Sequence, residues 1–137
     1  MTFQITGLTP LIQVYDMADS IRFYCEGLGF EVTADSGEFE APEGRYFDWA
    51  WLRLGGADLM LNTAYDPGER PPERDPARQS VHCDTGLFLA CPDIDAAAAD
   101  LRSRGIEVKG PETARYGMRQ LWLRDPDGYE LCLQAQA

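Results

Sequence analysis

The sequence is poor in residue types on which many common protein chemistries depend. Its 137 residues include one histidine, His82, and one lysine, Lys109. A lone histidine rarely builds an acid–base or metal cluster, and a single lysine leaves almost no candidate for Schiff-base chemistry. We expect His82 to be a solvated loop residue, with an approach to a cavity beside Asp84, or a role as a lone base, as alternatives.

Cysteines are few and scattered. The four thiols belong to Cys25, Cys83, Cys91 and Cys132, and no two of them have the CxxC spacing of a zinc knuckle or a redox pair. We expect reduced, partly buried thiols, which are typical of a reducing compartment.

Positive charge and long apolar runs are also lacking. The chain has 12 basic and 23 acidic residues, a net charge of −11. This balance disfavours nucleic acids and anionic membranes as partners, and it is compatible with a cationic ligand or simply with solubility. No apolar run approaches the ~20 residues of a membrane span, and residues 1–6 lack the pattern of a secretion signal. We therefore predict a cytoplasmic protein with neither a nucleic-acid nor a membrane partner.

Two stretches, residues 11–32 and 88–108, repeat one order of features. Each has a short apolar strand, an Asp that can cap a helix, an amphipathic helix, a Gly suited to a left-handed helix end, and another strand. A strand–turn–strand hairpin follows in each copy. The sequence therefore predicts a single α+β domain, residues 1–137, of two βαβββ modules at about 7–63 and 84–135.

The segment between the modules, about residues 64–83, is rich in Pro, Arg, Asp and Glu. Its four prolines, the last of them Pro76, predict the absence of regular structure over residues 64–81. A plain connection is the expected role, with a mobile lid as the alternative. A polar loop is also expected at residues 36–44.

The chain resembles the vicinal oxygen chelate superfamily of glyoxalases, bleomycin-resistance proteins and dioxygenases. The resemblance covers nearly the whole chain and is carried by residues 16–32, including Phe23–Tyr24 and Leu28–Gly29–Phe30, and by the turn at residues 125–131. These motifs are specific for the fold and poor guides to activity. The resemblance implies that each module is a curved, mixed four-stranded sheet with its helix on the convex side, and that the two concave faces form the ligand site.

Enzymes of that superfamily mostly hold a divalent metal through His, Glu or Gln side chains on cavity strands. The matching positions here are occupied by Thr9, Met60, Gly86 and Cys132. A register slip of two residues would bring in Asn62 and Gln134, which are weak neutral ligands. Neither set suits a hard or borderline cation. We therefore predict no metal, no cofactor and no catalytic residues.

The alternation of side chains along the strands divides them into two faces. Apolar residues such as Ile12, Leu52 and Leu121 point towards the helices, which leaves the opposite parity for the concavity. All three tryptophans fall in this second set and could stack on a flat ligand. They could instead fill the gap between concave faces or between subunits. The predicted ligand-binding residues are Phe47, Trp49, Trp51, Asn62, Phe88, Met118, Gln120 and Trp122.

Among members of the superfamily, the acidic charge and the lost metal ligands are most similar to bleomycin-resistance-type binding proteins. That similarity implies a non-catalytic protein that sequesters an antibiotic or other natural product with a flat aromatic group. It also implies a homodimer, and Pro10 suggests that the first strand is an edge or exchanged strand. The alternatives are a glyoxalase- or dioxygenase-like enzyme with an unusual site, perhaps using His82, and a structural or regulatory partner whose cavity is filled.

Overall fold

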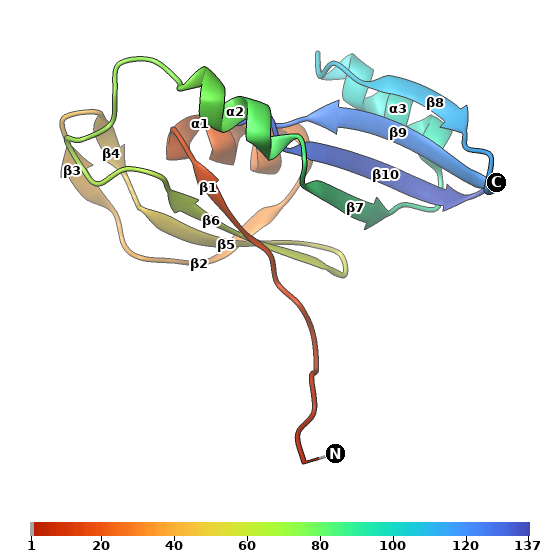
Figure 1. Cartoon of the computed structure of the whole chain (residues 1–137), viewed down its shortest axis with the longest axis horizontal. Helices are drawn as coiled ribbons and strands as arrows, with labels where there is room; N and C mark the ends of the chain where they lie inside the picture. Colours follow the sequence, from red (N-terminus) through yellow and green to blue (C-terminus); the bar gives the residue numbers. More distant parts are fainter. Residues whose placement is uncertain (1) are drawn as a thin grey trace. The chain divides into compact units, whose positions relative to one another are not determined.

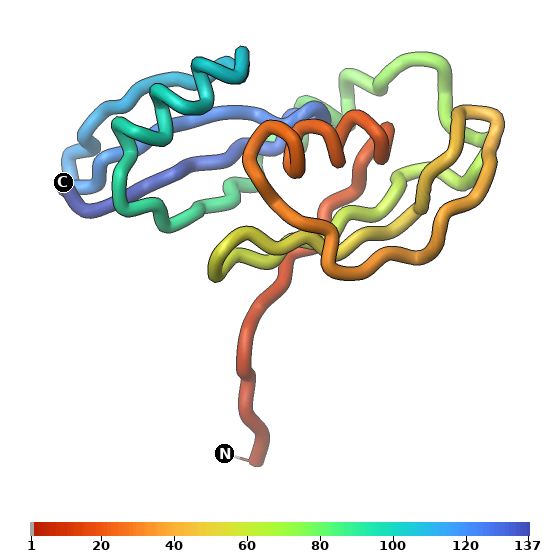
Figure 2. Tube along the Cα trace, turned by 180° about the vertical axis from the view of Figure 1, so that it is seen from behind, coloured from red at the N-terminus to blue at the C-terminus, as the bar shows by residue number. Residues whose placement is uncertain are grey.

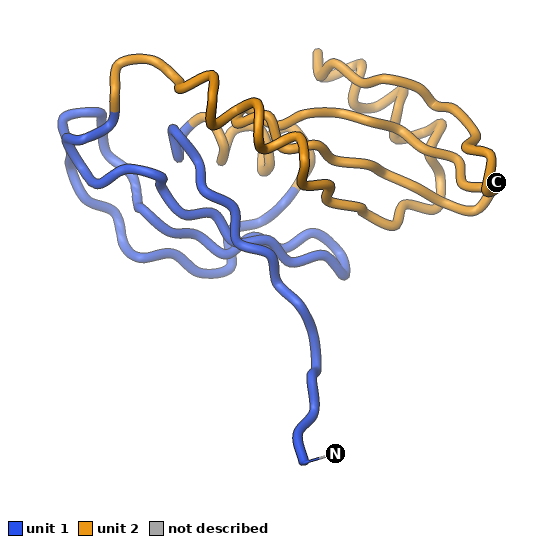
Figure 3. Tube along the Cα trace, in the orientation of Figure 1, with its two compact units in different colours: residues 1–18, 30–70 blue, residues 19–29, 71–137 orange. Residues whose placement is uncertain are grey.

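The computed structural model describes residues 2–137 and has the expected mixed α+β fold, with two four-stranded sheets, a small two-stranded sheet and helices (Figure 1). It divides into two compact units, one of Met1–Ala18 with Phe30–Arg70 and one of Asp19–Gly29 with Pro71–Ala137 (Figure 3). The strands of the first unit are β1 (Leu11–Val14), β2 (Glu31–Asp35), β3 (Phe39–Ala41), β4 (Gly44–Tyr46), β5 (Trp49–Leu54) and β6 (Ala57–Thr63). The other elements are α1 (Met17–Ile21), the π-helix η1 (Arg22–Gly27), α2 (Pro76–His82), β7 (Gly86–Ala90), α3 (Ile94–Ser103), β8 (Lys109–Thr113), β9 (Met118–Arg124) and β10 (Glu130–Gln136).

The large sheet of the first unit has the strand order β1-β6-β5-β2, with β1 parallel to β6 and the other pairs antiparallel. Every second residue along these strands is apolar and buried on one face of the sheet, as the sequence predicts. The strands β3 and β4 form a separate hairpin that overlaps the expected polar loop at residues 36–44. The buried face of the sheet is formed by Ile12, Val14, Ala50, Leu52, Leu59 and Leu61.

The N-terminal segment, residues 2–10, has no regular structure and runs away from its sheet as an extended chain (Figure 1). Its last residue, Pro10, lies just before the edge strand β1, and the Pro10 carbonyl accepts a hydrogen bond from the Met60 N–H at 2.8 Å. A proline at an edge loses no ladder bond, because its missing N–H has no partner strand to meet.

The second unit contains the other large sheet, in the order β7-β10-β9-β8, with β7 parallel to β10. The helix α3 lies along one face of this sheet (Figure 2), where Ile94, Ala98 and Leu101 pack in one buried cluster with Leu121 of β9. The Asp93 carboxylate accepts a hydrogen bond from the Ala96 N–H at 3.0 Å, which confirms the predicted N-terminal cap of α3.

The segment from Met17 to Leu28, predicted as one α-helix, is instead a short α-helix followed by π-helical turns. The Leu28 N–H bonds to the Phe23 carbonyl, five residues earlier, at 3.1 Å. In the second unit, this segment joins the turn that follows β9 through two buried side chains. The Tyr24 hydroxyl donates to Asp125 at 2.7 Å, and the Ser20 hydroxyl donates to Asp127 at 3.4 Å.

The helix α2 overturns the expectation that prolines exclude regular structure from residues 64–81. Asp75 caps this helix by accepting a hydrogen bond from the Ala77 N–H at 2.9 Å, and Pro76 is the first helical residue. The first turn of a helix has free N–H groups in any case, so a proline there costs no hydrogen bond. Within the described residues, no helix is long and apolar enough to cross a membrane.

Candidate functional site

The open face of the second sheet carries a row of four side chains, one from each strand. In this row Phe88, Cys132, Trp122 and Lys109 are cross-strand neighbours on β7, β10, β9 and β8. The rings of Phe88 and Trp122 meet edge to face, with centroids 5.5 Å apart and planes at 88°. Cys132, on the strand between them, is fully buried, and burial raises the pKa of its thiol to about 11. Cys132 therefore serves as part of the floor of this face.

The neighbouring row is polar. Gln120 is only 4 % exposed. Its side-chain amide donates to the Tyr116 hydroxyl at 2.7 Å and to the side-chain oxygen Oε1 of Gln134 at 3.2 Å. Glu112 of β8 is the cross-strand partner of Gln120. These bonds hold the Gln120 amide in one orientation, so that it can present a set pattern of polar atoms to a ligand.

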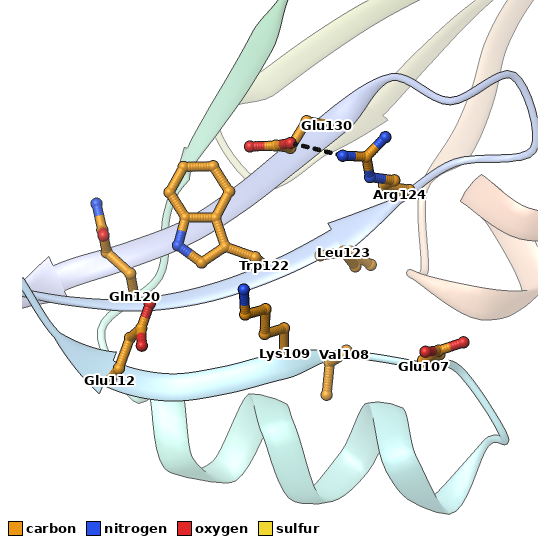
Figure 4. Close-up of a pocket in the computed structure, with 9 residues that line it drawn as sticks. All are labelled: Glu107, Val108, Lys109, Glu112, Gln120, Trp122, Leu123, Arg124 and Glu130. Carbon is orange, nitrogen blue, oxygen red and sulfur yellow. Dashed lines mark hydrogen bonds and ion pairs between the residues drawn. The ribbon is translucent and has the colours of Figure 1, made fainter. Parts of the chain in front are cut away.

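A cavity of about 600 Å³ opens beside the two rows (Figure 4). This volume is in the range of sites for small organic molecules. The Trp122 indole is the one aromatic ring in its lining, and charged side chains of both signs surround that ring. The cavity is lined by Glu107, Val108, Lys109, Glu112, Gln120, Trp122, Leu123, Arg124 and Glu130.

A second hollow of the same unit, about 620 Å³ in volume, lies beside η1. Its arginines are engaged in ion pairs at 2.9 Å, Arg22 and Arg74 with Asp19, and Arg104 with Asp100. The two arginines beside Asp19 hold the pKa of that carboxyl below its usual value, chiefly through the Arg74 hydrogen bond. No tryptophan lines this hollow, so the cavity at Trp122 is the better candidate for a flat ligand.

The open face of the first sheet carries the other two tryptophans. The rings of Trp49 and Trp51 meet edge to face with centroids 6.5 Å apart. The Trp51 indole N–H donates to Asp58 at 2.9 Å, and Arg53 pairs with the same carboxylate oxygen at 2.9 Å. The Trp51 bond, followed by the Arg53 bond, lowers the pKa of Asp58. Asp58 therefore holds the Trp51 indole in place.

The predicted site residues thus lie in two places. Gln120 and Trp122 line the cavity, and Phe88 packs on Trp122. Met118 begins β9 and pairs with Gln136 at the sheet end. The remaining four lie in the first unit. Trp49 and Trp51 share the open face of its sheet, where Asn62 is the cross-strand partner of Trp49, and Phe47 lies in the connection between β4 and β5.

The four positions that match metal ligands of the superfamily do not fit a divalent cation. Met60 is paired with Leu11 and Trp51, and Cys132 with Phe88 and Trp122. Gly86 is paired with Glu130, and Thr9 precedes β1. These rows offer one thioether and one buried thiol of raised pKa, which is a poor donor set for a hard or borderline ion. Among residues 2–137, no three His, Cys, Asp or Glu side chains are grouped as metal ligands.

His82 lies at the end of α2, where it is half-buried. Its Nδ1 is 2.7 Å from the Asp127 carbonyl oxygen, and its ring stacks on Tyr129 at 4.0 Å with the planes 10° apart. The expectation of a solvated loop histidine is therefore wrong. His82 holds α2 against the turn after β9, and it is not among the residues that line the cavity.

Sequence reasoning missed most of the charged lining of the cavity. Lys109 and Glu112 belong to β8, which begins just after the repeat of residues 88–108 within which the sequence predicts this strand. Arg124 ends β9 and Glu130 begins β10, on either side of a hairpin turn, and neither is among the predicted site residues. The only lysine of the sequence lies opposite the predicted site residue Trp122 in the sheet. This pairing would have indicated a charged site, but it follows from the register of β8 against β9 and not from the sequence of β8.

Comparison with known proteins identifies the protein superfamily to which this chain belongs. Residues 5–133 match the family model of the Glyoxalase/Bleomycin resistance protein/Dioxygenase superfamily, and the chain is a member of that superfamily. A comparison with curated proteins finds no match.

Solved structures add particular relatives within this class. TnmS3, an antibiotic binding protein from Streptomyces sp. CB03234, is 28% identical, with a TM-score of 0.67 over 98% of this chain and 99% of its own. A glyoxalase/bleomycin resistance protein from the same organism is 30% identical, with a TM-score of 0.61 over 93% and 97%. The bleomycin-binding protein of Streptomyces verticillus, solved with copper(II)-bleomycin, shares the fold at 19% identity, with a TM-score of 0.69 over 99% and 100%.

Proposed function

We propose that this protein binds and sequesters a small molecule with a flat aromatic group, such as an antibiotic or another natural product, in the cytoplasm and without catalysis. The observation that carries the proposal is the half-buried Trp122 indole, which lines a cavity of about 600 Å³ and is backed by Phe88. An aromatic ring held on one side by another ring is pre-organised to stack on a ligand with its free surface.

The relative TnmS3 supports a binding role. It is described as an antibiotic binding protein, and it covers nearly the same length as this chain. The poor donor set at the superfamily's metal positions supports the same reading over a metal-dependent enzyme, since Met60 and the buried Cys132 thiol would have to supply its ligands.

The proposal includes a homodimer. The large apolar residues Phe3, Ile5 and Leu8 are 65%, 77% and 89% exposed in the extended N-terminal segment. Exposed apolar side chains on a segment that continues an edge strand favour pairing with a second copy, which would bury them. Exchange of this segment between the two copies is the form of dimer that we favour.

The test of ligand binding is isothermal titration calorimetry with a panel of flat antibiotics. Replacing Trp122 by Ala should weaken binding by roughly 1–3 kcal/mol, the scale of a lost aromatic hot spot. Trp122→Phe keeps a ring at the site and should retain most of the affinity. Thermal melts would show whether the Ala variant is still folded.

Two results would count against the proposal. Unchanged affinity in folded Trp122→Ala protein would remove the cavity from ligand binding. Stoichiometric zinc, nickel, iron or manganese in protein purified from its own cell, with turnover of a superfamily substrate, would favour the enzyme alternative. Native mass spectrometry of the same sample would report subunit number, metal and any retained ligand together.

A further inference from the structure

Lys109, the only lysine of the chain, lies in the proposed ligand cavity. It is the cross-strand partner of Trp122, and Figure 4 shows its side chain extending from β8 towards β9 and the indole. Paired residues on neighbouring antiparallel strands project on the same face about 5 Å apart. A ring stacked on Trp122 would therefore have its edge close to the Lys109 ammonium group.

The other polar groups of the cavity that can donate a hydrogen bond are already engaged. Arg124 pairs with Glu130 at 3.4 Å, and Gln120 is bonded to Tyr116 and Gln134. By contrast, no ion pair or hydrogen bond joins the Lys109 side chain to any other described residue. The ammonium group thus keeps three donors for a ligand.

The single ammonium group beside Trp122 matters more for a stacked ligand than the net charge of the chain, although three carboxylates and two basic groups line the cavity. A net charge of −11 favours a cationic ligand at long range. Beyond about 8 Å, however, salt screens most of that field, and the nearest charge dominates. Lys109 is in register with Trp122, so its ammonium group would attract a negative oxygen at the edge of a ring stacked on that indole.

We propose that Lys109 binds an anionic oxygen at the edge of the ligand, so that the preferred ligands are flat aromatic acids. This inference rests on the proposed function, because it requires a ring stacked on Trp122. Lysine suits the role since its ammonium group is a compact point charge with rotatable donors, which can follow a single oxygen.

The carboxylates of the cavity limit the ligand to one acidic group. Glu107 and Glu112 flank Lys109 along the chain and line the same cavity. A second anionic group would meet these carboxylates without a free cation to offset them, because Arg124 is already paired with Glu130. The site should therefore favour monoacids over diacids with the same ring.

The experiment compares two probes of the same shape, anthraquinone-2-carboxylate and anthraquinone-2-carboxamide, by calorimetry at neutral pH. Wild-type protein should bind the acid more tightly than the amide, by roughly three- to tenfold. Lys109→Gln should abolish this preference by lowering the affinity for the acid to about that for the amide. Arg45→Gln is the matched control, because it removes the same charge from an exposed residue of the first unit that pairs with Glu38.

A second readout uses the single lysine as a label. Reductive methylation with ¹³C-formaldehyde gives one dimethyl-lysine signal besides that of the N-terminal amine. The acid should shift this signal in wild-type protein and leave it in place in Trp122→Ala protein. The amide should shift it much less than the acid does.

The outcomes separate the two proposals. If the acid and the amide bind equally and Lys109→Gln changes neither, the role of Lys109 is overturned while flat-ligand binding stands. If Trp122→Ala leaves the affinity for both probes unchanged, or if neither probe binds wild-type protein at millimolar concentration, both proposals fail for this class of ligand.

Discussion

The positions of single side chains decide what this protein can recognise. Trp51 and Trp122 are held by different neighbours. Trp51 donates its N–H to Asp58, whereas Trp122 rests against Phe88 and faces Lys109 in register. The Trp51 indole N–H is used within the protein, while the Trp122 ring lines the cavity. This difference makes Trp122 the residue on which the binding proposal depends.

Glycine at position 128 is required by its backbone and by its surroundings. Gly128 has φ +84°, and a Cβ atom added there would lie 3.0 Å from the Gln79 carbonyl oxygen of α2. Gly128→Ala should therefore destabilise the protein by about 2–3 kcal/mol, since backbone strain and a collision with α2 add together. Urea unfolding would measure this loss.

Gly105→Ala is the matched control for that substitution. Gly105 also has a positive φ, +76°, but an added Cβ would meet nothing within 4 Å. Its replacement should cost only the backbone strain, about 1 kcal/mol. Equal losses in the two variants would show that α2 does not press on the turn after β9.

At the scale of elements, the turn between β9 and β10 holds the second unit together. Its Asp125 carboxylate accepts hydrogen bonds from the Tyr24 hydroxyl at 2.7 Å and from the backbone N–H groups of Asp127 and Tyr129, each at 2.9 Å. Gln79 of α2 donates to the Pro126 carbonyl at 3.0 Å. Two helical segments that precede the sheet of the second unit, η1 and α2, are thus bound to one five-residue turn, which makes its carboxyl groups important to stability.

The pKa of Asp125 predicts how stability depends on pH. Burial raises this pKa from its ordinary 3.8 to about 6, against the lowering effect of the hydrogen bonds from Tyr24 and Tyr129. Between these two values the folded protein binds a proton that the unfolded chain does not. The free energy of unfolding should therefore fall as the pH rises from about 4 to about 6, by up to about 3 kcal/mol, and this contribution should then level off.

Asp125→Asn would test this dependence, because the amide carries no charge while its oxygen can still accept from the two backbone N–H groups. Urea unfolding between pH 4.5 and 7.5 should show that the free energy of unfolding depends less on pH in the variant than in the wild type. The difference should be about the size of the contribution that Asp125 makes over this range. Asp100→Asn, at an exposed carboxylate on α3, should leave the wild-type slope in place. Parallel profiles for Asp125→Asn and wild type would contradict the assignment.

Local sequence patterns predicted most elements because each element satisfies its own chemistry. The helix caps at Asp16 and Asp93 could be predicted without knowledge of the tertiary structure, and so could the alternating strands. The helix α2 was missed because prolines were counted without regard to position, although Pro76 follows a capping Asp75. The π-turns of η1 have no sequence signal that we can name.

The candidate site was predictable only in its aromatic part. Parity along β9 placed Gln120 and Trp122 on the open face, since the alternate residues Leu121 and Leu123 are buried. The charged part depends on the register of β8 against β9, which shifts between Lys109 and Glu112. A register with an irregularity is set by pairing across the sheet, and no pattern within a single strand reveals it.

At the scale of the whole molecule, the extended N-terminal segment leaves large apolar side chains exposed when the chain is alone. Residues 2–10 place Phe3, Ile5 and Leu8 in water, although burying each would contribute roughly 1.5–3 kcal/mol. The segment also continues the edge strand β1, whose outer backbone groups are open to another strand. A protein of net charge −11 resists unspecific association, so contact through this segment should be specific.

Deletion of residues 2–8 should therefore convert a dimer into a monomer. Light scattering during size-exclusion chromatography at micromolar concentrations should give twice the 15.3 kDa chain mass for the full chain and the mass of a single chain for the truncated one. The combined substitution of Phe3, Ile5 and Leu8 by Ser keeps the length of the segment and should have the same effect, because apolar burial is the driving force. A full-length chain that runs as a monomer, or a truncated chain that remains a dimer, would exclude this segment as the dimer contact.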